Sequence, residues 1–294
     1  MERIKEAVQR ARQERSGNGA GFGRTATASL GSVRDAATQD VPSRIVYSKT
    51  RVVELSPPQL RDKRIVSGFE QSTFTEAFRI LATQVSHTLR KNAWSTLAIT
   101  SPNEREGKTL VAINLAISLA QEYHHSCILV EADMRQPSAC EYFGLPSATG
   151  LSDYLASEMP LEQLLFHPDV GNLVVLPGGT ATTHSSELLG SRKMAKLVRE
   201  LKTRYESRIA VFDLPPLLAA ADVLAFAPNV DAVLLVVEEA ATPAEDVRRA
   251  ADMLGATPII GTVLNKSFER MVSAYGVPSR GLTVTRARRR PADG

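Results

Sequence analysis

Short apolar runs and amphipathic stretches alternate along most of the chain. The apolar runs have the length of strands, and they predict strands at 95–100, 127–130, 172–176, 209–212, 232–237 and 258–264. Stretches with helical spacing lie between most of them, at about 108–123, 186–204, 216–227 and 243–255. Strands that are apolar throughout and alternate with helices predict an α/β fold: a doubly wound, mainly parallel sheet with helices on both faces.

A further helix is expected near the start of this alternating region. Thr73 and Glu76 have the spacing of a capping box, which satisfies free N–H groups in the first helical turn. Apolar residues then recur at helical spacing up to about residue 90: Phe74, Phe78, Leu81, Val85 and Leu89.

Composition divides the chain into three parts. In residues 1–68, we expect a short helix followed by a flexible linker. The helix is expected at the start of the chain, where a narrow apolar face is too small for a core element. The linker is expected at 16–43, which is rich in Gly, Ala, Ser and Thr. The end of this part, 44–68, predicts an extended lead-in. Residues 69–267 predict the folded domain, and 268–294 predict a basic flexible tail.

Hydrophobic content, the first residues and the cysteines indicate where the protein is located. The chain is 43% hydrophobic, and no apolar run approaches the length of a membrane span. Its start, MERIKEAVQRARQERSG, is charged and does not resemble a secretory signal. Cys127 and Cys140 suit a reducing cytosol, so a cytoplasmic location is expected.

The formal net charge of +3 is unevenly distributed. Residues 1–69 hold 13 Lys and Arg against 7 Asp and Glu, and residues 266–294 hold 7 against 2. The middle, 70–265, holds 15 against 23 and is therefore acidic. Basic arms on an acidic domain suggest contact with an anionic surface, either membrane or nucleic acid. The alternative is that both arms are simply solvated.

One segment predicts a phosphate-binding loop. Residues 95–115, STLAITSPNEREGKTLVAINL, combine a strand, a polar loop, Gly107-Lys108-Thr109 and a helix. A helix N-terminus presents unpaired N–H groups and partial positive charge to a polyphosphate. Lys108 is expected to reach the β- and γ-phosphates, and the Thr109 hydroxyl to bind Mg²⁺. The strict pattern has Gly at position 102, where this chain has Pro102.

Acidic residues follow two other predicted strands. Glu131 and Asp133 come directly after 127–130, and Asp213 follows 209–212. Ligands of parallel α/β sheets bind outside the carboxyl ends of the strands, where the phosphate loop also lies. The combination predicts a Mg-nucleotide site. Taken singly, an Asp after an apolar strand is more often a turn or cap residue.

Several segments together resemble one known family. They are EAFRIL, TSPNEREGKTLVAINLA, ILVEADMRQPS, FGLPSATGLSDYL, LPGG followed by SSELLGS, VFDLPPLL and GTVLNK, between about 69 and 266. The chain resembles the cytoplasmic bacterial tyrosine autokinases of exopolysaccharide synthesis and export, especially the exosortase-associated variant. These are P-loop proteins related to the partitioning and septum-site ATPases.

The resemblance implies roles for matching residues. ATP phosphates and Mg²⁺ would be held by the loop and the start of its helix: Asn103, Glu104, Arg105, Glu106, Gly107, Lys108, Thr109 and Leu110. Glu131 and Asp133 stand where the family carries D-x-D, and Asp213 stands at the Walker B position. The implied metal-binding residues are Thr109, Glu131 and Asp213, and the implied catalytic residues are Lys108, Asp133, Arg135 and Asp213. Asn265 matches an adenine-binding Asn or is a turn residue.

The chain also departs from the family pattern. Glu104 and Arg105 replace Pro and Gly in the phosphate loop, where a positive φ is costly for Arg. The oligomer motif E-x-x-R-x-x-R is reduced to Glu76 and Arg79, with Ala82 at its last position. The usual tyrosine cluster of the tail is reduced to Tyr275, and Tyr47 is the other candidate phosphate acceptor.

The leading hypothesis is therefore an ATP- and Mg²⁺-dependent tyrosine autokinase that regulates exopolysaccharide synthesis or export. An ATP-dependent switch or adaptor without kinase activity is the alternative. A partitioning-type ATPase is less favoured, because Asn103 stands where that class carries an extra Lys, and nucleic-acid binding is disfavoured with it. The resemblance implies a membrane-embedded chain-length regulator as partner, with homo-oligomers and peripheral attachment at the inner membrane as further expectations.

Overall fold

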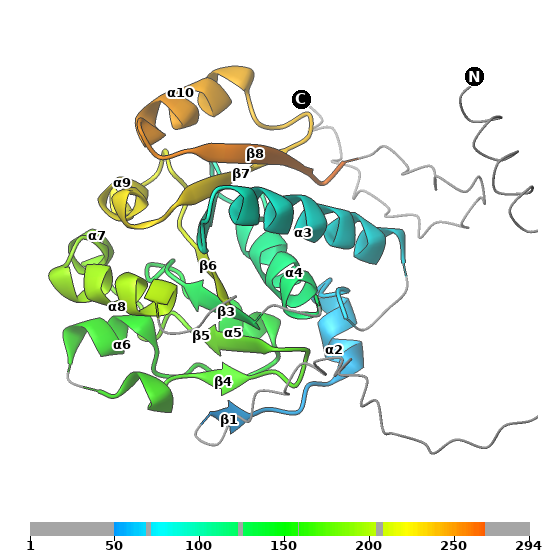
Figure 1. The fold of residues 1–294 in the computed structure, drawn as a ribbon, viewed down its shortest axis with the longest axis vertical. Coiled ribbons are helices and arrows are strands. Elements are labelled where there is room, and N and C mark those ends of the chain that lie inside the picture. The colour runs from blue at the N-terminus through cyan, green and yellow to red at the C-terminus, as the bar shows by residue number, and fades with distance from the viewer. Residues whose placement is uncertain (1–49, 69–71, 123–125, 158, 204–207, 268–294) are drawn as a thin grey trace, which may run out of the picture. The chain divides into compact units, whose positions relative to one another are not determined.

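The computed structural model describes residues 50–68, 72–122, 126–157, 159–203 and 208–267. Its described strands form one eight-stranded sheet in the order β1-β4-β5-β3-β6-β2-β7-β8 (Figure 1). The strands are β1 Arg51–Val52, β2 Thr96–Thr100, β3 Ser126–Glu131, β4 Phe166–His167, β5 Leu173–Leu176, β6 Arg208–Asp213, β7 Ala232–Glu238 and β8 Ile259–Asn265. All six strands predicted from apolar runs are present, each within one or two residues of its expected bounds.

The sheet is mainly parallel, as its pattern predicts. Neighbouring strands pair in parallel except β4 and β5, which pair antiparallel. The two strands that the sequence pattern missed, β1 and β4, are two residues long, too short to show a periodicity. The predicted fold class, a doubly wound α/β sheet, is confirmed.

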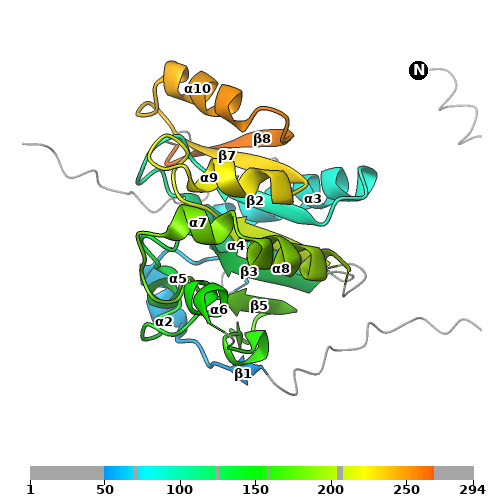
Figure 2. The same ribbon diagram turned by 90° about the vertical axis from the view of Figure 1, so that its left-hand side faces the viewer.

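Helices cover both faces of the sheet (Figures 1 and 2). The α-helices are α2 Pro57–Asp62, α3 Thr73–Lys91, α4 Lys108–Ala120, α5 Ala139–Tyr142, α6 Leu151–Ala156, α7 Ser185–Leu189, α8 Arg192–Thr203, α9 Asp222–Phe226 and α10 Ala244–Leu254. Two 3₁₀ helices, η1 Leu161–Gln163 and η2 Ala227–Asn229, complete the described elements. No helix in the described ranges is both long enough and apolar enough to cross a membrane.

Each face of the sheet has its own apolar core. Leu97 and Ile99 of β2 pack into the cluster formed with α2, α3, α4 and α5, whereas Ala98 packs into the cluster on the opposite face. This second cluster contains residues of α6 to α10. Successive strand side chains point to opposite faces, so a strand buried on both sides must be apolar at every position.

The long helix α3 begins one residue earlier than its sequence motif indicates. The Ser72 hydroxyl caps it by accepting a hydrogen bond from the Thr75 N–H at 3.1 Å. The capping box predicted at Thr73 is therefore wrong, because Thr73 already lies within the helix. Val85 and Leu89 are buried as the spacing predicts, but Phe74 is 59% exposed.

Two predicted helices are interrupted in the structure. The stretch 186–204 divides into α7 and α8 at Gly190, and the stretch 216–227 contains a turn before α9 begins. The buried apolar residues of α7, α8 and α9 all belong to one core cluster, so the separate helices bury their apolar faces against the same side of the sheet. Periodicity reports which face is buried and does not locate a break in the backbone.

The predicted extended lead-in is wrong for its described part, residues 50–68. This part contains β1 and α2, and Leu60 and Ile65 are each 1% exposed in the core beside α4. The buried Asn114 side chain of α4 accepts hydrogen bonds from the N–H groups of Val66 and Ser67. Packing against the sheet therefore begins before residue 69, where the sequence placed the boundary.

Truncation of Leu60 tests whether this segment is part of the folded domain. We expect Leu60→Ala to lower the free energy of unfolding by about 2–5 kcal/mol, because it leaves a cavity in the core. Val52→Ala, at a side chain that is 58% exposed, should change it by less than about 0.5 kcal/mol. Urea denaturation measures both values, and equal effects would contradict the packing of α2.

Candidate functional site

The phosphate loop connects β2 to the N-terminus of α4. Gly107 is the N-cap of α4, with φ 90°, a left-handed conformation that glycine adopts readily. A Cβ atom at this position would lie 2.2 Å from Nδ2 of Asn265, so no side chain fits there. The first N–H groups of α4 have no partners within the helix and are available to an anion.

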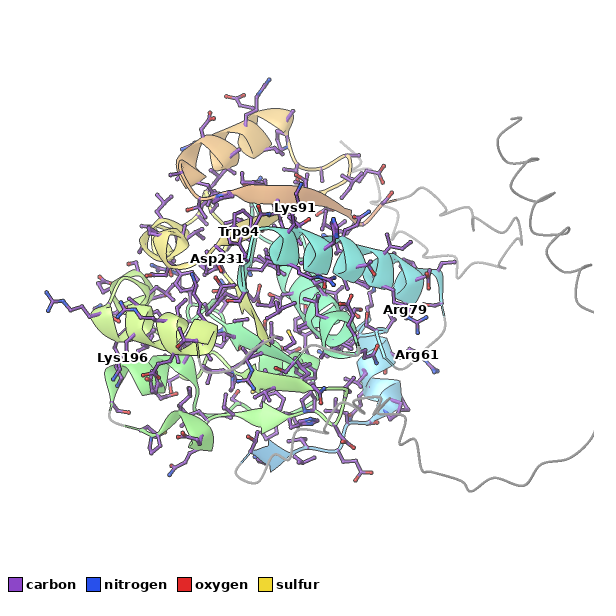
Figure 3. The ribbon with its side chains drawn as sticks, viewed as in Figure 1. Arg61, Arg79, Lys91, Trp94, Lys196 and Asp231 are labelled. Atoms are coloured by element: carbon purple, nitrogen blue, oxygen red, sulfur yellow. The ribbon has the colours of Figure 1, made fainter. Side chains whose placement is uncertain are left out.

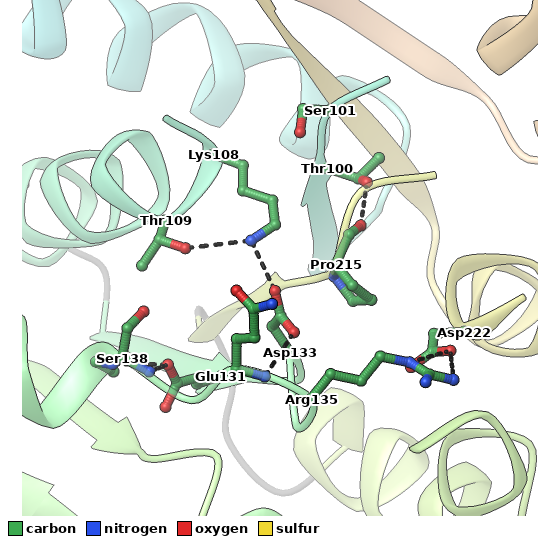
Figure 4. A network of polar contacts seen from close by, with 12 residues as sticks. Thr100, Ser101, Lys108, Thr109, Glu131, Asp133, Arg135, Ser138, Pro215 and Asp222 are labelled. Carbon is green, nitrogen blue, oxygen red and sulfur yellow. Dashed lines mark hydrogen bonds and ion pairs between the residues drawn. The ribbon is translucent and has the colours of Figure 1, made fainter. Parts of the chain in front are cut away.

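Three neighbouring strands bring the predicted residues together at this edge of the sheet. β6 lies between β3 and β2, and Asp213 is in register with Glu131 on one side and Ile99 on the other. The residues that follow these strand ends therefore surround the start of α4. Figure 4 shows Lys108, Thr109, Glu131 and Asp133 in this arrangement.

Lys108 forms a buried ion pair across the site. Its Nζ lies 2.8 Å from Oδ2 of Asp133 and 3.5 Å from Oγ1 of Thr109. The Lys108 and Asp133 side chains are only 14% and 9% exposed. Burial opposes the charged ammonium, but the carboxylates of Asp213 and Asp133 outweigh it and raise the pKa of Lys108 above its ordinary value. Lys108 therefore stays protonated at neutral pH.

Asp213 is the least satisfied charge in the site. Its side chain is 1% exposed, and neither carboxylate oxygen has a hydrogen-bond partner in the described part of the chain. Burial raises the pKa of Asp213 to about 7, although the Lys108 charge and the nearby Thr109 hydroxyl oppose the shift. A buried carboxylate without partners is expensive, and a cation beside it would remove that cost.

These residues fit a magnesium ion. Mg²⁺ prefers oxygen ligands and is commonly bound through one or two protein groups together with substrate phosphates and water. Asp213 and the Thr109 hydroxyl would supply such oxygens. Among the described residues, no group of three or more His, Cys, Asp or Glu side chains is placed to hold a metal. As is usual for Mg²⁺, the protein oxygens would share the ion with phosphate and water oxygens.

The carboxylate of Glu131 binds the protein backbone. Oε1 accepts hydrogen bonds from the N–H groups of Ser138 and Ala139, the latter at 2.6 Å, and Oε2 accepts from Gly178 at 2.7 Å. Burial raises the pKa of Glu131, and these three hydrogen bonds oppose the shift. Both oxygens thus tie the loop after β3 to the loop after β5. The predicted metal contact of Glu131 competes with these bonds.

Arg135 lies against a residue that the sequence analysis did not single out. Its guanidinium forms a bidentate contact with Asp222, with Nη2 2.9 Å from Oδ1 (Figure 4). Asp222 is fully buried at the first position of α9. Arg135 therefore links the loop after β3 to the segment after β6. A lone Asp at a helix start gives no sequence signal for such a pairing.

The phosphate loop itself is strained at one of the two unusual positions. Arg105 has φ 63°, so it adopts the left-handed conformation that glycine adopts without cost. Glu104 and Arg105 are exposed at the tip of the loop, while Glu106 is 3% exposed. Asn103 contacts Glu106 through its N–H at 3.1 Å. Leu110, also expected at the nucleotide, packs its side chain against the apolar core.

Asn265 lies at the base of the phosphate loop, at the end of β8. Its Nδ2 donates a hydrogen bond to the Glu106 carbonyl at 2.8 Å. The structure thus brings Asn265 to the loop, and its predicted adenine contact remains a prediction. Both candidate acceptors, Tyr275 and Tyr47, lie outside the described residues.

Comparison with known proteins identifies the family. No protein-family model matches the chain. It is 29% identical over 208 residues to the tyrosine-protein kinase YwqD of Bacillus subtilis, covering 70% of this chain and 86% of YwqD. The crystal structure of the VpsO kinase domain superimposes with a TM-score of 0.58 and 32% identity, over 67% of this chain and all of that domain. The chain belongs to the bacterial tyrosine kinase family.

The succinoglycan biosynthesis transport protein ExoP of Rhizobium meliloti is a further relative. It is 33% identical over 231 residues, which are 76% of this chain but only 29% of ExoP. The match therefore spans most of the length of YwqD and less than a third of the length of ExoP.

Shortening Glu131 tests whether its carboxylate supports the backbone. Glu131→Asp places at this position the residue that the family pattern carries, yet its side chain is one methylene shorter. We expect it to lose part of the contact with Ser138, Ala139 and Gly178 and to lower the free energy of unfolding by about 1–3 kcal/mol. Glu162→Asp, at an exposed position of η1, is the matched control and should change it by less than about 0.5 kcal/mol. An unchanged stability of Glu131→Asp would contradict the structural role.

The raised pKa of Asp213 predicts a pH-dependent stability. Burial raises the pKa of Asp213 to about 7 in the folded protein, whereas in the unfolded chain the group releases its proton near the ordinary Asp pKa of 3.8. Stability contributed by this group therefore falls as pH rises through this window. In EDTA, Asp213→Asn should become more stable relative to wild type between pH 5 and pH 8, by up to about 2.5 kcal/mol. Parallel pH curves for the two proteins would contradict the assignment.

Proposed function

We propose that this chain is an ATP- and Mg²⁺-dependent protein-tyrosine kinase that autophosphorylates and regulates exopolysaccharide synthesis or export. The names of its relatives support the reaction, since YwqD is a tyrosine-protein kinase, and ExoP supports the process. The observation that carries the proposal is the buried, unpartnered carboxylate of Asp213 beside Lys108 at the start of α4. Such a site has negative charge to be balanced by a metal ion and N–H groups to receive phosphate.

The residues divide into those that bind phosphate and those that hold the metal. Lys108 and the first N–H groups of α4 bind the β- and γ-phosphates, for which Lys108 exchanges its contact with Asp133. Thr109 and Asp213 hold Mg²⁺. Mg-ATP supplies the transferable phosphoryl group together with a cation that neutralises the charge developing during transfer.

Asp133 is the group assigned to the acceptor. Its carboxylate accepts the proton of a tyrosine hydroxyl, and the phenolic oxygen then forms the new bond to phosphorus while the bond to ADP breaks. The buried position of Asp133, 2.8 Å from Lys108, keeps it near the phosphate-binding group. Orientation and charge neutralisation therefore provide most of the catalysis.

Residues around the phosphate-binding groups have supporting roles in the proposed function. The side-chain carbonyl of Asn265 accepts a hydrogen bond from the adenine amino group, while its Nδ2 keeps the contact with Glu106. Arg135 stabilises the site through Asp222 and turns toward phosphate only when that contact opens. Glu104 and Arg105 remain at the loop tip, where the Arg105 charge offsets that of Glu104.

The partners follow from the relatives and the charge distribution. A membrane-embedded chain-length regulator activates the kinase, and the basic arms hold the chain at the cytoplasmic side of the inner membrane. Glu76 and Arg79, 3.6 Å apart on exposed positions of α3, contribute to contacts between copies of the chain. Figure 3 shows where Arg79 lies on this helix. Tyr275 and Tyr47 are the acceptors.

Phosphotyrosine mapping by mass spectrometry, after incubation with Mg-ATP and membrane extract, tests the proposal. Wild type should carry phosphate on Tyr275 or Tyr47, and Lys108→Met should reduce it at least about 100-fold. Lys202→Met is the matched control, because Lys202 pairs with Asp231 at 2.7 Å at the other end of the sheet. It should retain phosphorylation.

The same experiment distinguishes the alternative function. Wild type that binds ADP but carries no phosphotyrosine would contradict the kinase and support an ATP-dependent switch or adaptor. Wild type that binds no nucleotide would contradict both.

A further inference from the structure

A polar network ties the phosphate loop to the ends of β7 and β8. It joins the loop to the first turn of α10 and to the residues that follow the two strands. We call it the loop clasp, and its residues are Asn103, Glu106, Glu238, Thr242, Asp246, Asn265 and Lys266.

Glu106 is the centre of the loop clasp. Its Oε1 accepts a hydrogen bond from the Thr242 hydroxyl at 2.6 Å, and its Oε2 accepts from the Asn103 N–H at 3.1 Å. The Asn103 side chain in turn donates to Oδ2 of Asp246 at 2.9 Å. The Glu106 carboxylate is thus bonded both within its own loop, to Asn103, and to Thr242 in the segment before α10.

Lys266 binds the loop backbone at Arg105, the residue before Glu106. Its Nζ donates to the Arg105 carbonyl at 2.7 Å and pairs with Oε2 of Glu238 at 2.7 Å. The Lys266 side chain is 42% exposed, so its removal leaves no cavity in the core. Together with Asn265, which bonds the next carbonyl, it fixes the backbone directly before Gly107.

Backbone strain is concentrated in the same place. Arg105, Ala240 and Lys266 have φ values of 63°, 55° and 55°, and they are three of the six non-glycine residues with positive φ in the described ranges. Ala240 lies between Glu238 and Thr242, which are bonded to each other. Such conformations cost about 1 kcal/mol or more for residues with a Cβ and persist only where surrounding contacts determine them.

We propose that Glu106, Thr242 and Lys266 are positioning residues that hold the phosphate loop in its anion-binding conformation although Arg occupies position 105. A loop that is already ordered loses less conformational entropy when it binds an anion. The bonds to Glu106 and to the Arg105 carbonyl supply this order from outside the loop. The inference rests on the proposed nucleotide binding, but the order of the loop is measurable without nucleotide.

Thr242→Val and Lys266→Met test the loop clasp. Thr96→Val is the matched control, because the Thr96 hydroxyl also bonds a carboxylate, Asp231, at 2.8 Å at the opposite end of β2. The position of Asp231 is visible in Figure 3. Without nucleotide, amide hydrogen exchange at 103–107 should accelerate about tenfold in the two clasp variants and remain unchanged in the control.

ADP affinity, measured by titration calorimetry, provides the functional readout. Both clasp variants should bind ADP about tenfold more weakly than wild type. Thr242→Ser, which keeps the hydroxyl that Thr242→Val lacks, should bind ADP with wild-type affinity. Arg105→Gly removes the strain at position 105. In that background, Lys266→Met should weaken ADP binding by less than about threefold.

The outcomes separate the clasp from the proposed function. Unchanged loop exchange in both clasp variants, or equal effects of Thr242→Val and Thr96→Val on exchange, would overturn the inference. Wild type that fails to bind ADP would overturn nucleotide binding, while the exchange rates would still test the clasp. A loss of ADP affinity that Thr242→Ser does not rescue would also contradict the role of the Thr242 hydroxyl.

Discussion

The charge of Asp213 connects most features of this site. The carboxylate ends the central strand β6, between two parallel neighbours, where it is 1% exposed and has no hydrogen-bond partner placed among the described residues. Lys108 opposes that charge from the start of α4 while pairing directly with Asp133. Burying three ionisable groups together is unfavourable unless another ligand compensates them. In the proposed function, a cation and a polyphosphate would compensate these charges.

The loops around Asp213 and Lys108 are held in place largely by side chains that bind backbone N–H groups. Glu131 binds three N–H groups from two loops, and Glu106 binds the loop of which it is part as well as Thr242. Arg135 is held by the buried Asp222. Residues that a motif would assign to the ligand thus have partners within the protein, in the loops around the start of α4. Catalytic sites depend on this support, because small displacements of a reacting group have large effects on rate.

Much of the fold could be predicted from the chain alone. Six strands and the alternation with helices were readable because a strand buried on both faces must be apolar at every position. The position of the phosphate loop was also readable, since Gly107-Lys108-Thr109 lies between such a strand and a helix. The segment containing Leu60 was missed, because isolated apolar residues in a polar stretch acquire meaning only through what they pack against.

What the sequence by itself determined was therefore local: which segments are strands or helices, and which residue types follow each strand. The family segments and the ordering of acids after strands belong to this part. Only the tertiary structure decided which partners those side chains have. Glu131 reaches Gly178, Arg135 reaches Asp222, and Lys266 reaches the Arg105 carbonyl, all across large separations in sequence. Periodicity and spacing describe neighbours along the chain, whereas hydrogen bonds and ion pairs depend on distances that exist only after the sheet has assembled.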